Sequence, residues 1–246
     1  MIILDGKKLS EKILKKLKAK IKRKRLKIKL SIVLIGEDSD SKIFIKQKKK
    51  ACEKVGIDFE LFKFSSKISN SELKKEIKKT IQNPDIKNIV VQLPLPKGLN
   101  TEEILSLIPK EKDAEIISPV VCAVDRIFKN YKISLKNKEI VLIGKGRLVG
   151  QPLSAWLRKQ NIKFFSLREI PRRGTNIDKI KNADIIISGA GKPNLIKGKM
   201  VKKGVVVIDV GIDVDFETVS KKASYITPTP GGVGPMTVAC LLENLI

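Results

Sequence analysis

The sequence contains no histidine in its 246 residues. Because histidine is the commonest general base and a principal zinc ligand, its absence excludes a Ser-His-Asp triad and most zinc sites. Cysteine is also scarce: Cys52, Cys122 and Cys240 are far apart, and neither a metal-binding spacing nor a disulfide framework follows from them. Such cysteine usage suits a reducing compartment, so we expect a cytoplasmic protein without a bound metal.

Long apolar runs are missing as well, and none reaches the length of a membrane span. The start of the chain, MIILDGKKLSEK, is too short and too charged for a signal peptide, so we expect neither an export leader nor a membrane partner. Aromatic residues make up 4% of the chain, whereas hydrophobic residues make up 42% and charged residues 31%. These proportions are typical of a soluble globular protein with one large or two modest domains.

Acidic residues are few relative to basic ones, 26 against 51, which gives a formal net charge of +25. A charge of this size can indicate nucleic acid or an anionic ligand as partner. Most of the excess is lysine spread along helical stretches with few aromatic residues between, so we favour a solvated basic surface. A basic nucleic-acid-binding protein is kept as a remote alternative.

Short apolar runs alternate with helical patterns along the whole chain, which predicts parallel sheets with helices on their faces. The predicted strands are residues 30–35, 57–64, 88–93, 139–143, 162–167, 184–188, 205–210 and 225–227. The predicted helices are residues 9–26, 41–55, with Gly56 as its C-cap, 71–82, capped by Asn70 or Ser71, 119–129 and 149–160. The pattern restarts near residues 115–120, so we expect two α/β domains that meet there.

The segment from Thr227 to Pro235 holds three glycines and three prolines, which predicts a stiff loop with few side chains. Pro235 suits the first position of a helix, and four apolar residues then follow at i, i+3, i+4 and i+7: Val238, Leu241, Leu242 and Leu245. The loop is therefore expected to end at the N-terminus of an amphipathic helix, where polar or anionic ligand groups are favoured. A rigid turn before a packed helix is the alternative.

One lysine of the predicted helix 41–55 differs from the others. Lys48 falls in a narrow stripe with Phe44, Ala51 and Val55, whereas the remaining lysines after Phe44 point to the opposite side. A lysine in a partly apolar wall can act as a base or proton donor near neutral pH. The alternative is a lysine whose stem covers apolar surface while its ammonium group stays in water.

Polar, glycine-rich or cationic positions mark three strand ends. Gln92 lies in an apolar strand that ends at two prolines, where its amide needs partners. Gly144, Gly146 and Gly150 follow a strand and precede a helix, which is the setting of a phosphate-binding loop, although a plain turn has the same pattern. The next strand ends at Ser166 and Arg168, with Arg172 and Arg173 close behind, and this cationic environment favours NADP over NAD.

The segment TPTPGGVGPMTVACLLENL resembles the C-terminal signature of the methylenetetrahydrofolate dehydrogenase/cyclohydrolase family. SKIFIKQKKKACEKVG, VQLPLP, KDAEIISP and GKGRLVGQP are similar to further segments of that family. The resemblance implies oxidation of 5,10-methylenetetrahydrofolate by NADP to the methenyl compound and hydrolysis of that compound to 10-formyltetrahydrofolate. These reactions serve one-carbon metabolism and purine biosynthesis, and the resemblance further implies a homodimer.

The resemblance also implies an architecture: two α/β domains flanking a cleft, the C-terminal one Rossmann-like, with the last helix returning to the N-terminal domain. Residues 1–117 and the helix 235–246 are then expected to form the folate-binding catalytic domain. Residues 118–234 are expected to form the NADP-binding domain.

The functional residues that the resemblance implies fall into three groups. The catalytic residues are Lys48 and Gln92. The substrate-binding residues are Phe44, Glu115, Gly231, Gly232 and Pro235. The cofactor-binding residues are Gly144, Lys145, Gly146, Arg147, Gly150, Ser166, Arg168, Gly189, Gly211 and Gly232.

Several positions depart from the family pattern. Phe44 stands where the family has tyrosine, Gly146 replaces a serine, and Ile116–Ser118 replace a Gly-Phe-His-like stretch. Glu115 carries its carboxylate one methylene further than the family aspartate. Two alternatives therefore stay open beside the bifunctional enzyme: a member that has lost one activity, and a non-catalytic paralogue that binds folate or nucleotide.

Overall fold

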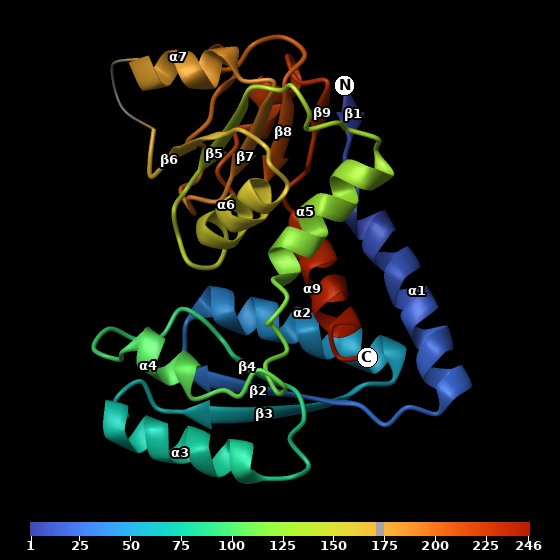
Figure 1. Cartoon of the computed structure of the whole chain (residues 1–246), viewed down its shortest axis with the longest axis vertical. Helices are drawn as coiled ribbons and strands as arrows, with labels where there is room; N and C mark the ends of the chain where they lie inside the picture. The colour runs from blue at the N-terminus through green and yellow to red at the C-terminus, as the bar shows by residue number, and fades with distance from the viewer. Residues whose placement is uncertain (171–174) are drawn as a thin grey trace. The chain divides into compact units, whose positions relative to one another are not determined.

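The computed structural model describes residues 1–170 and 175–246 (Figure 1). The chain divides into two compact units. Unit 1 consists of Met1–Glu11 and Ser118–Cys240, and unit 2 consists of Lys12–Ile117 and Leu241–Ile246. Each unit contains one sheet in which all paired strands run parallel, so the predicted α/β class is confirmed.

The sheet of unit 2 has three strands in the order β3-β2-β4. Figure 1 shows α2 on one face of this sheet and α3 on the other, which explains why the central strand β2 is buried from its second residue onward. The strands are β2 (Lys29–Ile35), β3 (Asp58–Phe64) and β4 (Ile89–Val91), and the helices between them are α2 (Ser39–Val55), α3 (Asn70–Gln82) and, after β4, α4 (Thr101–Ser106).

Local capping chemistry sets the ends of the two long helices of unit 2. The Asp38 carboxylate accepts a hydrogen bond from the Ser41 N–H at 2.8 Å, and Gly56 ends α2 with φ of 83°, as its predicted C-cap role requires. The predicted cap of α3 at Asn70 or Ser71 is wrong. Ser69 caps this helix instead, because its hydroxyl and the Glu72 carboxylate form a reciprocal capping box.

The sheet of unit 1 has six strands in the order β1-β9-β8-β7-β5-β6. Its strands are β1 (Ile2–Ile3), β5 (Ile140–Ile143), β6 (Phe165–Leu167), β7 (Ile185–Ser188), β8 (Val206–Asp209) and β9 (Tyr225–Ile226). Its helical elements are α5 (Pro119–Asn130), α6 (Gly150–Lys159), α7 (Thr175–Asn182), the short η1 (Gly198–Met200) and α8 (Phe216–Ser220). Isoleucine and valine of β5, β7 and β8 pack in its core with apolar residues from the flanking helices and loops.

Each end of the chain is divided between the two units. The boundary near Ser118 was expected to put residues 1–117 together, but β1 pairs with β9, so Met1–Glu11 belongs to unit 1. The helix α1 (Gly6–Lys24) begins in unit 1 and continues in unit 2. The helix α9 (Val233–Glu243) likewise begins in unit 1, and Leu241–Ile246 belongs to unit 2, which confirms the expected return of the chain end.

Two expectations for the last helix are corrected. Pro235 is the third residue of α9, which begins at Val233. The helix is also buried nearly all round and is therefore not amphipathic, because small and apolar residues fill the positions between those of the predicted stripe: Met236, Ala239 and Cys240 are each at most 1% exposed. Within residues 1–170 and 175–246, no helix is long and apolar enough to cross a membrane.

Candidate active site

Lys48 is the centre of a buried polar group in unit 2. It lies on the inner face of α2 and is 7% exposed, whereas Lys46, Lys49, Lys50 and Lys54 are exposed. The stripe argument therefore identified the buried lysine correctly. Phe44, from the same stripe, is 42% exposed, so its ring is available to a ligand and is not part of the core.

The Lys48 ammonium has two partners in unit 2. Its Nζ donates a hydrogen bond of 3.1 Å to Oε1 of Gln92, which is 9% exposed. Its Nζ also lies 3.6 Å from Oε1 of Glu115, whose side chain is one-third exposed. One amide oxygen and one carboxylate thus hold the ammonium in place, and this arrangement satisfies a cation that would otherwise be costly to bury.

Gln92 is held by the end of the sheet. It follows β4 directly, and its backbone N–H donates to the carbonyl of Val33 on β2 at 2.9 Å. Its side-chain Nε2 donates to the carbonyl of Leu93 at 2.8 Å, which leaves Oε1 turned toward Lys48. The polar residue in an apolar strand therefore has the partners that its burial requires.

Glu115 is positioned by a short extension of the same sheet. Ile89 of β4 forms an isolated parallel bridge with Asp113, through hydrogen bonds from the Ile89 N–H to Lys112 and from the Ala114 N–H to Ile89. The Asp113 carboxylate then accepts from the Glu115 N–H at 2.8 Å. The Glu115 carboxylate from this loop and the Gln92 amide from the end of β4 therefore both reach Lys48.

The residues after Glu115 depart from the expected pattern and are exposed. Ile116 is 54% and Ile117 63% exposed, whereas Ser118 caps α5. Asn244, at the chain end, donates through Nδ2 to the carbonyls of Ala114 at 3.1 Å and Ile117 at 2.8 Å. Asn244 therefore fixes the backbone on both sides of Glu115, a role that no local signal indicated.

The glycine-rich loop of unit 1 follows β5 and is packed too closely for side chains. Gly144 has φ of 99°, and a Cβ there would lie 2.5 Å from the carbonyl oxygen of Gly189. A Cβ on Gly150 would contact the Gly144 carbonyl, and a Cβ on Gly189 would contact the Val149 side chain. These three glycines bring the loop between β5 and α6 against the loop after β7, at the carboxyl ends of two neighbouring parallel strands.

The rest of this loop is open. Gly146 would meet nothing within 4 Å through an added Cβ, and Lys145 is exposed. No side chain among the described residues caps the N-terminus of α6. The Gln151 N–H donates to the carbonyl of Gly146 at 3.0 Å and Pro152 has no N–H, so this helix end presents fewer N–H groups to an anion than a regular helix does. Arg147 lies in the same loop and is half-buried.

The strand end at which the sequence predicts a cationic environment is described only in part. Ser166 lies in β6 beside Leu142, and Arg168 follows this strand and is exposed. Glu169 pairs with Lys192 at 3.0 Å, and the pKa of its carboxyl lies below the usual range because of this contact. Arg172 and Arg173 lie outside the described residues.

The proline-glycine loop contacts the start of α1. Gly231 has φ of 110°, and its carbonyl accepts from the Lys7 N–H at 2.8 Å. Gly232 is buried, with its carbonyl against Gly6 and its Cα against the carbonyl of Pro228. A side chain at Gly6 or at Gly232 would therefore displace backbone. Close packing within the chain thus accounts for Gly232, whereas Gly234 has open space.

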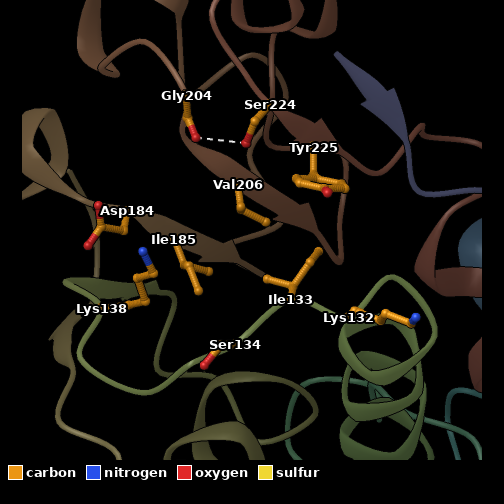
Figure 2. Close-up of a pocket in the computed structure, with 10 residues that line it drawn as sticks. All are labelled: Lys132, Ile133, Ser134, Lys138, Asp184, Ile185, Gly204, Val206, Ser224 and Tyr225. Carbon is orange, nitrogen blue, oxygen red and sulfur yellow. Dashed lines mark hydrogen bonds between the residues drawn. The ribbon is translucent and has the colours of Figure 1, made fainter.

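A separate pocket of about 240 Å³ lies at the opposite edge of the unit 1 sheet (Figure 2). It is lined by the first residues of three strands, Ile185, Val206 and Tyr225, and by the segment that contains Lys138. Figure 2 shows Lys138 turned toward Asp184, which Lys202 already engages at 2.7 Å. Because dinucleotides bind outside the carboxyl ends of parallel strands, this pocket is not the predicted cofactor site.

The fold and these residues define a class of protein: a two-unit α/β protein with glycine-rich loops at the carboxyl ends of one parallel sheet and, in the other unit, a buried Lys-Gln pair beside a partly exposed glutamate. Two family models match the chain. The tetrahydrofolate dehydrogenase/cyclohydrolase catalytic domain matches residues 4–115, and the NAD(P)-binding domain of the same family matches residues 118–246. The chain belongs to the tetrahydrofolate dehydrogenase/cyclohydrolase family.

Individual relatives are similar to this chain over its full length. The bifunctional protein FolD of Nautilia profundicola is 42% identical over 277 aligned positions, which cover 100% of this chain and 96% of the relative. The crystal structure of the FolD methylenetetrahydrofolate dehydrogenase/cyclohydrolase of Campylobacter jejuni has a TM-score of 0.88, with 36% identity and coverage of 100% and 97%. The Trypanosoma brucei enzyme, in complex with NADP and an inhibitor, has a TM-score of 0.91, with 27% identity and coverage of 100% and 96%.

Proposed function

We propose that the chain oxidises 5,10-methylenetetrahydrofolate to 5,10-methenyltetrahydrofolate with NADP and hydrolyses the product to 10-formyltetrahydrofolate. Full-length membership of the family supports both reactions. The observation on which the proposal rests is the buried contact of 3.1 Å between Lys48 and Gln92, with Glu115 beside it. The folate-binding catalytic part is then residues 12–117 with the chain end, and the dinucleotide-binding part is unit 1.

The second reaction needs proton transfer, and Lys48 is the group that we assign to it. Water adds to the methenyl carbon and loses a proton, and opening of the ring then requires a proton on the leaving nitrogen. Gln92 and Glu115 hold the Lys48 ammonium from two sides, so its remaining N–H bond and the exposed part of Glu115 are left for the substrate. Because no histidine occurs in the chain, this lysine replaces the usual general base.

The first reaction makes different demands. The nicotinamide supplies the hydride acceptor, and a hydride transfer needs positioning rather than a protein acid or base. We assign the pyrophosphate to the loop with Gly144, Gly146 and Gly150, together with the N-terminus of α6. Exposed Lys145 and Arg168 favour the 2′-phosphate of NADP over the diol of NAD.

Folate contacts are assigned from the same geometry. The exposed ring of Phe44 can stack on the aminobenzoate group, and Glu115 can accept hydrogen bonds from the pterin. We also propose a homodimer, as the family resemblance implies, and a cytoplasmic location, which the scarce and widely spaced cysteines suit. Analytical ultracentrifugation of the purified chain measures its oligomeric state and so tests the homodimer.

A spectrophotometric assay tests the two reactions directly. Purified protein is given methylenetetrahydrofolate with NADP or NAD in parallel, and the absorbances of the reduced cofactor and of methenyltetrahydrofolate are followed. Reduced NADP with only a transient methenyl signal is the expected result. Accumulation of the methenyl compound would leave only the dehydrogenase, and no turnover with either cofactor would favour the non-catalytic paralogue.

A further inference from the structure

Two buried carboxylates at the end of β8 have no part in the proposed reactions. Asp209 is the last residue of this strand and is 3% exposed, and Asp213 follows four residues later and is completely buried. Buried carboxylates are costly unless hydrogen bonds compensate for the lost water, so their partners identify what they hold.

Asp213 holds the loop after β7. Its Oδ2 accepts from the Ser188 hydroxyl at 2.6 Å and from the Ala190 N–H at 2.7 Å, and its Oδ1 accepts from the Lys192 N–H at 2.7 Å. Three short hydrogen bonds from one side chain therefore fix the segment Ser188–Lys192. This segment includes Gly189, whose backbone lies against Gly144 of the glycine-rich loop.

Asp209 holds Asp213 in turn. Its Oδ1 accepts from the backbone N–H of Gly211 at 3.2 Å and of Asp213 at 3.1 Å, and its Oδ2 accepts from Val214 at 3.3 Å. The Thr229 hydroxyl of the proline-glycine loop donates to the same Oδ2 at 3.3 Å. The two acids thus connect, in series, the segments that follow β7, β8 and β9.

These three segments lie at one edge of a parallel sheet, the edge where ligands of open α/β sheets bind. We propose that Asp213 is a positioning residue for dinucleotide binding: its carboxylate sets the backbone of Ser188–Lys192 against the glycine-rich loop, and Asp209 orients Asp213. The proposal rests on the proposed function, because that function assigns the cofactor to these loops.

A carboxylate is needed at this position because all its partners are donors. An amide would keep one acceptor oxygen but would place an N–H₂ group against the Ala190 or Lys192 N–H, and that backbone donor would lose its partner. The loop would then shift, and the affinity for the dinucleotide would fall. The chemistry at Lys48 uses none of these groups.

The test compares Asp213→Asn with Asp215→Asn. Asp215 is also an acid of this segment. Its carboxylate caps α8 through the Thr218 N–H at 3.2 Å, and asparagine caps helices equally well. We expect Asp213→Asn to raise the KM and Kd for NADP by about tenfold or more, since charge-assisted hydrogen bonds to backbone are lost. Hydrolysis of added methenyltetrahydrofolate, which consumes no dinucleotide, should be unchanged in both variants.

A second variant covers the case in which Asp213→Asn does not fold. Ser188→Ala removes one of the donors and leaves the carboxylate, so it should raise the KM for NADP by a smaller factor with little change in kcat. Unchanged NADP affinity in the folded variants, beside a wild-type protein that binds NADP, would overturn the inference. Loss of kcat for hydrolysis in Asp213→Asn would also overturn it, because the role would then be general stability. A wild-type protein that binds no dinucleotide would overturn the proposed function as well.

Discussion

Replacing Lys48 by methionine separates the two proposed reactions. Methionine keeps an unbranched stem of similar length in the inner face of α2 but removes the ammonium that lies 3.1 Å from Gln92. A positioned acid or base contributes about 10²–10⁴-fold to a rate, so hydrolysis of methenyltetrahydrofolate should slow by that factor, or about 3–5 kcal/mol of transition-state stabilisation. NADP binding should persist, since the glycine-rich loops belong to unit 1.

The stability cost of this change can be worked out separately. Gln92 Oε1 loses its donor in a site where the residue is 9% exposed, and an unpaired buried acceptor costs about 1–3 kcal/mol. Urea unfolding therefore shows whether the variant is folded under assay conditions. Lys49→Met is the matched control, because Lys49 is exposed and its contact with Glu53 at 3.9 Å is a surface pair of small energy.

The assay follows the decay of methenyltetrahydrofolate absorbance in the absence of any dinucleotide. The reasoning is refuted if Lys48→Met hydrolyses the methenyl compound as fast as Lys49→Met does. Lost NADP binding in a folded Lys48→Met protein would equally contradict the assignment of the two ligands to separate units.

Two further predictions concern buried titratable groups. Burial raises the pKa of the Cys52 thiol to about 12, so an alkylating reagent at pH 8 should modify Cys52 only after unfolding, as mass spectrometry of digests would show; rapid labelling of the native protein contradicts this. Burial, and next the charge of Asp213, raise the pKa of Asp209, so the folded state binds this proton more tightly than the unfolded state. Wild-type stability should therefore fall relative to Asp209→Asn as the pH rises from about 4 through the raised value, and a pH-independent difference in urea midpoints contradicts this.

Most of the regular elements followed from local patterns, because a central parallel strand or an amphipathic helix needs only its own residues to be recognised. The buried strand β2 and the helix α2 are examples, and each begins within two residues of its predicted start. The strand β1 was not predicted, since two residues carry no period and its partner β9 lies more than 200 residues away in the chain. The short helices α4, α7 and α8 were missed for a related reason: five to eight residues make only about one to two turns, too few to show a helical period.

The residues of the candidate site likewise fall into two groups: those that a local sequence pattern indicates, and those that only the tertiary structure reveals. Lys48 and Gln92 each break a local apolar pattern, so the sequence marks them as buried polar groups in need of partners. Asp213 and Asn244 break no pattern. Asp213 lies in an acidic stretch whose composition is typical of a solvated turn, and Asn244 lies near a chain end. Both nevertheless hydrogen-bond to backbone that is distant in sequence. Only the tertiary structure brings those donors and acceptors together.

The departures from the family pattern lie at positions where packing constrains the side chain least. Gly146 has open space in place of a serine side chain, Phe44 is exposed, and Ile116 and Ile117 lie on the surface. A serine hydroxyl or a tyrosine hydroxyl at such positions could act only on a ligand, so its loss changes contacts to the ligand without disturbing the core.

The retained positions are constrained by the chain itself. Gly144, Gly150 and Gly189 have no room for a Cβ, and Lys48 and Gln92 satisfy each other in a buried site. Replacing any one of them alone would displace backbone or leave a buried polar group unpaired, at a cost of about 1–3 kcal/mol or more. Packing therefore preserves the framework of the proposed sites, whereas we expect the exposed departures to adjust substrate affinity and the balance between oxidation and hydrolysis.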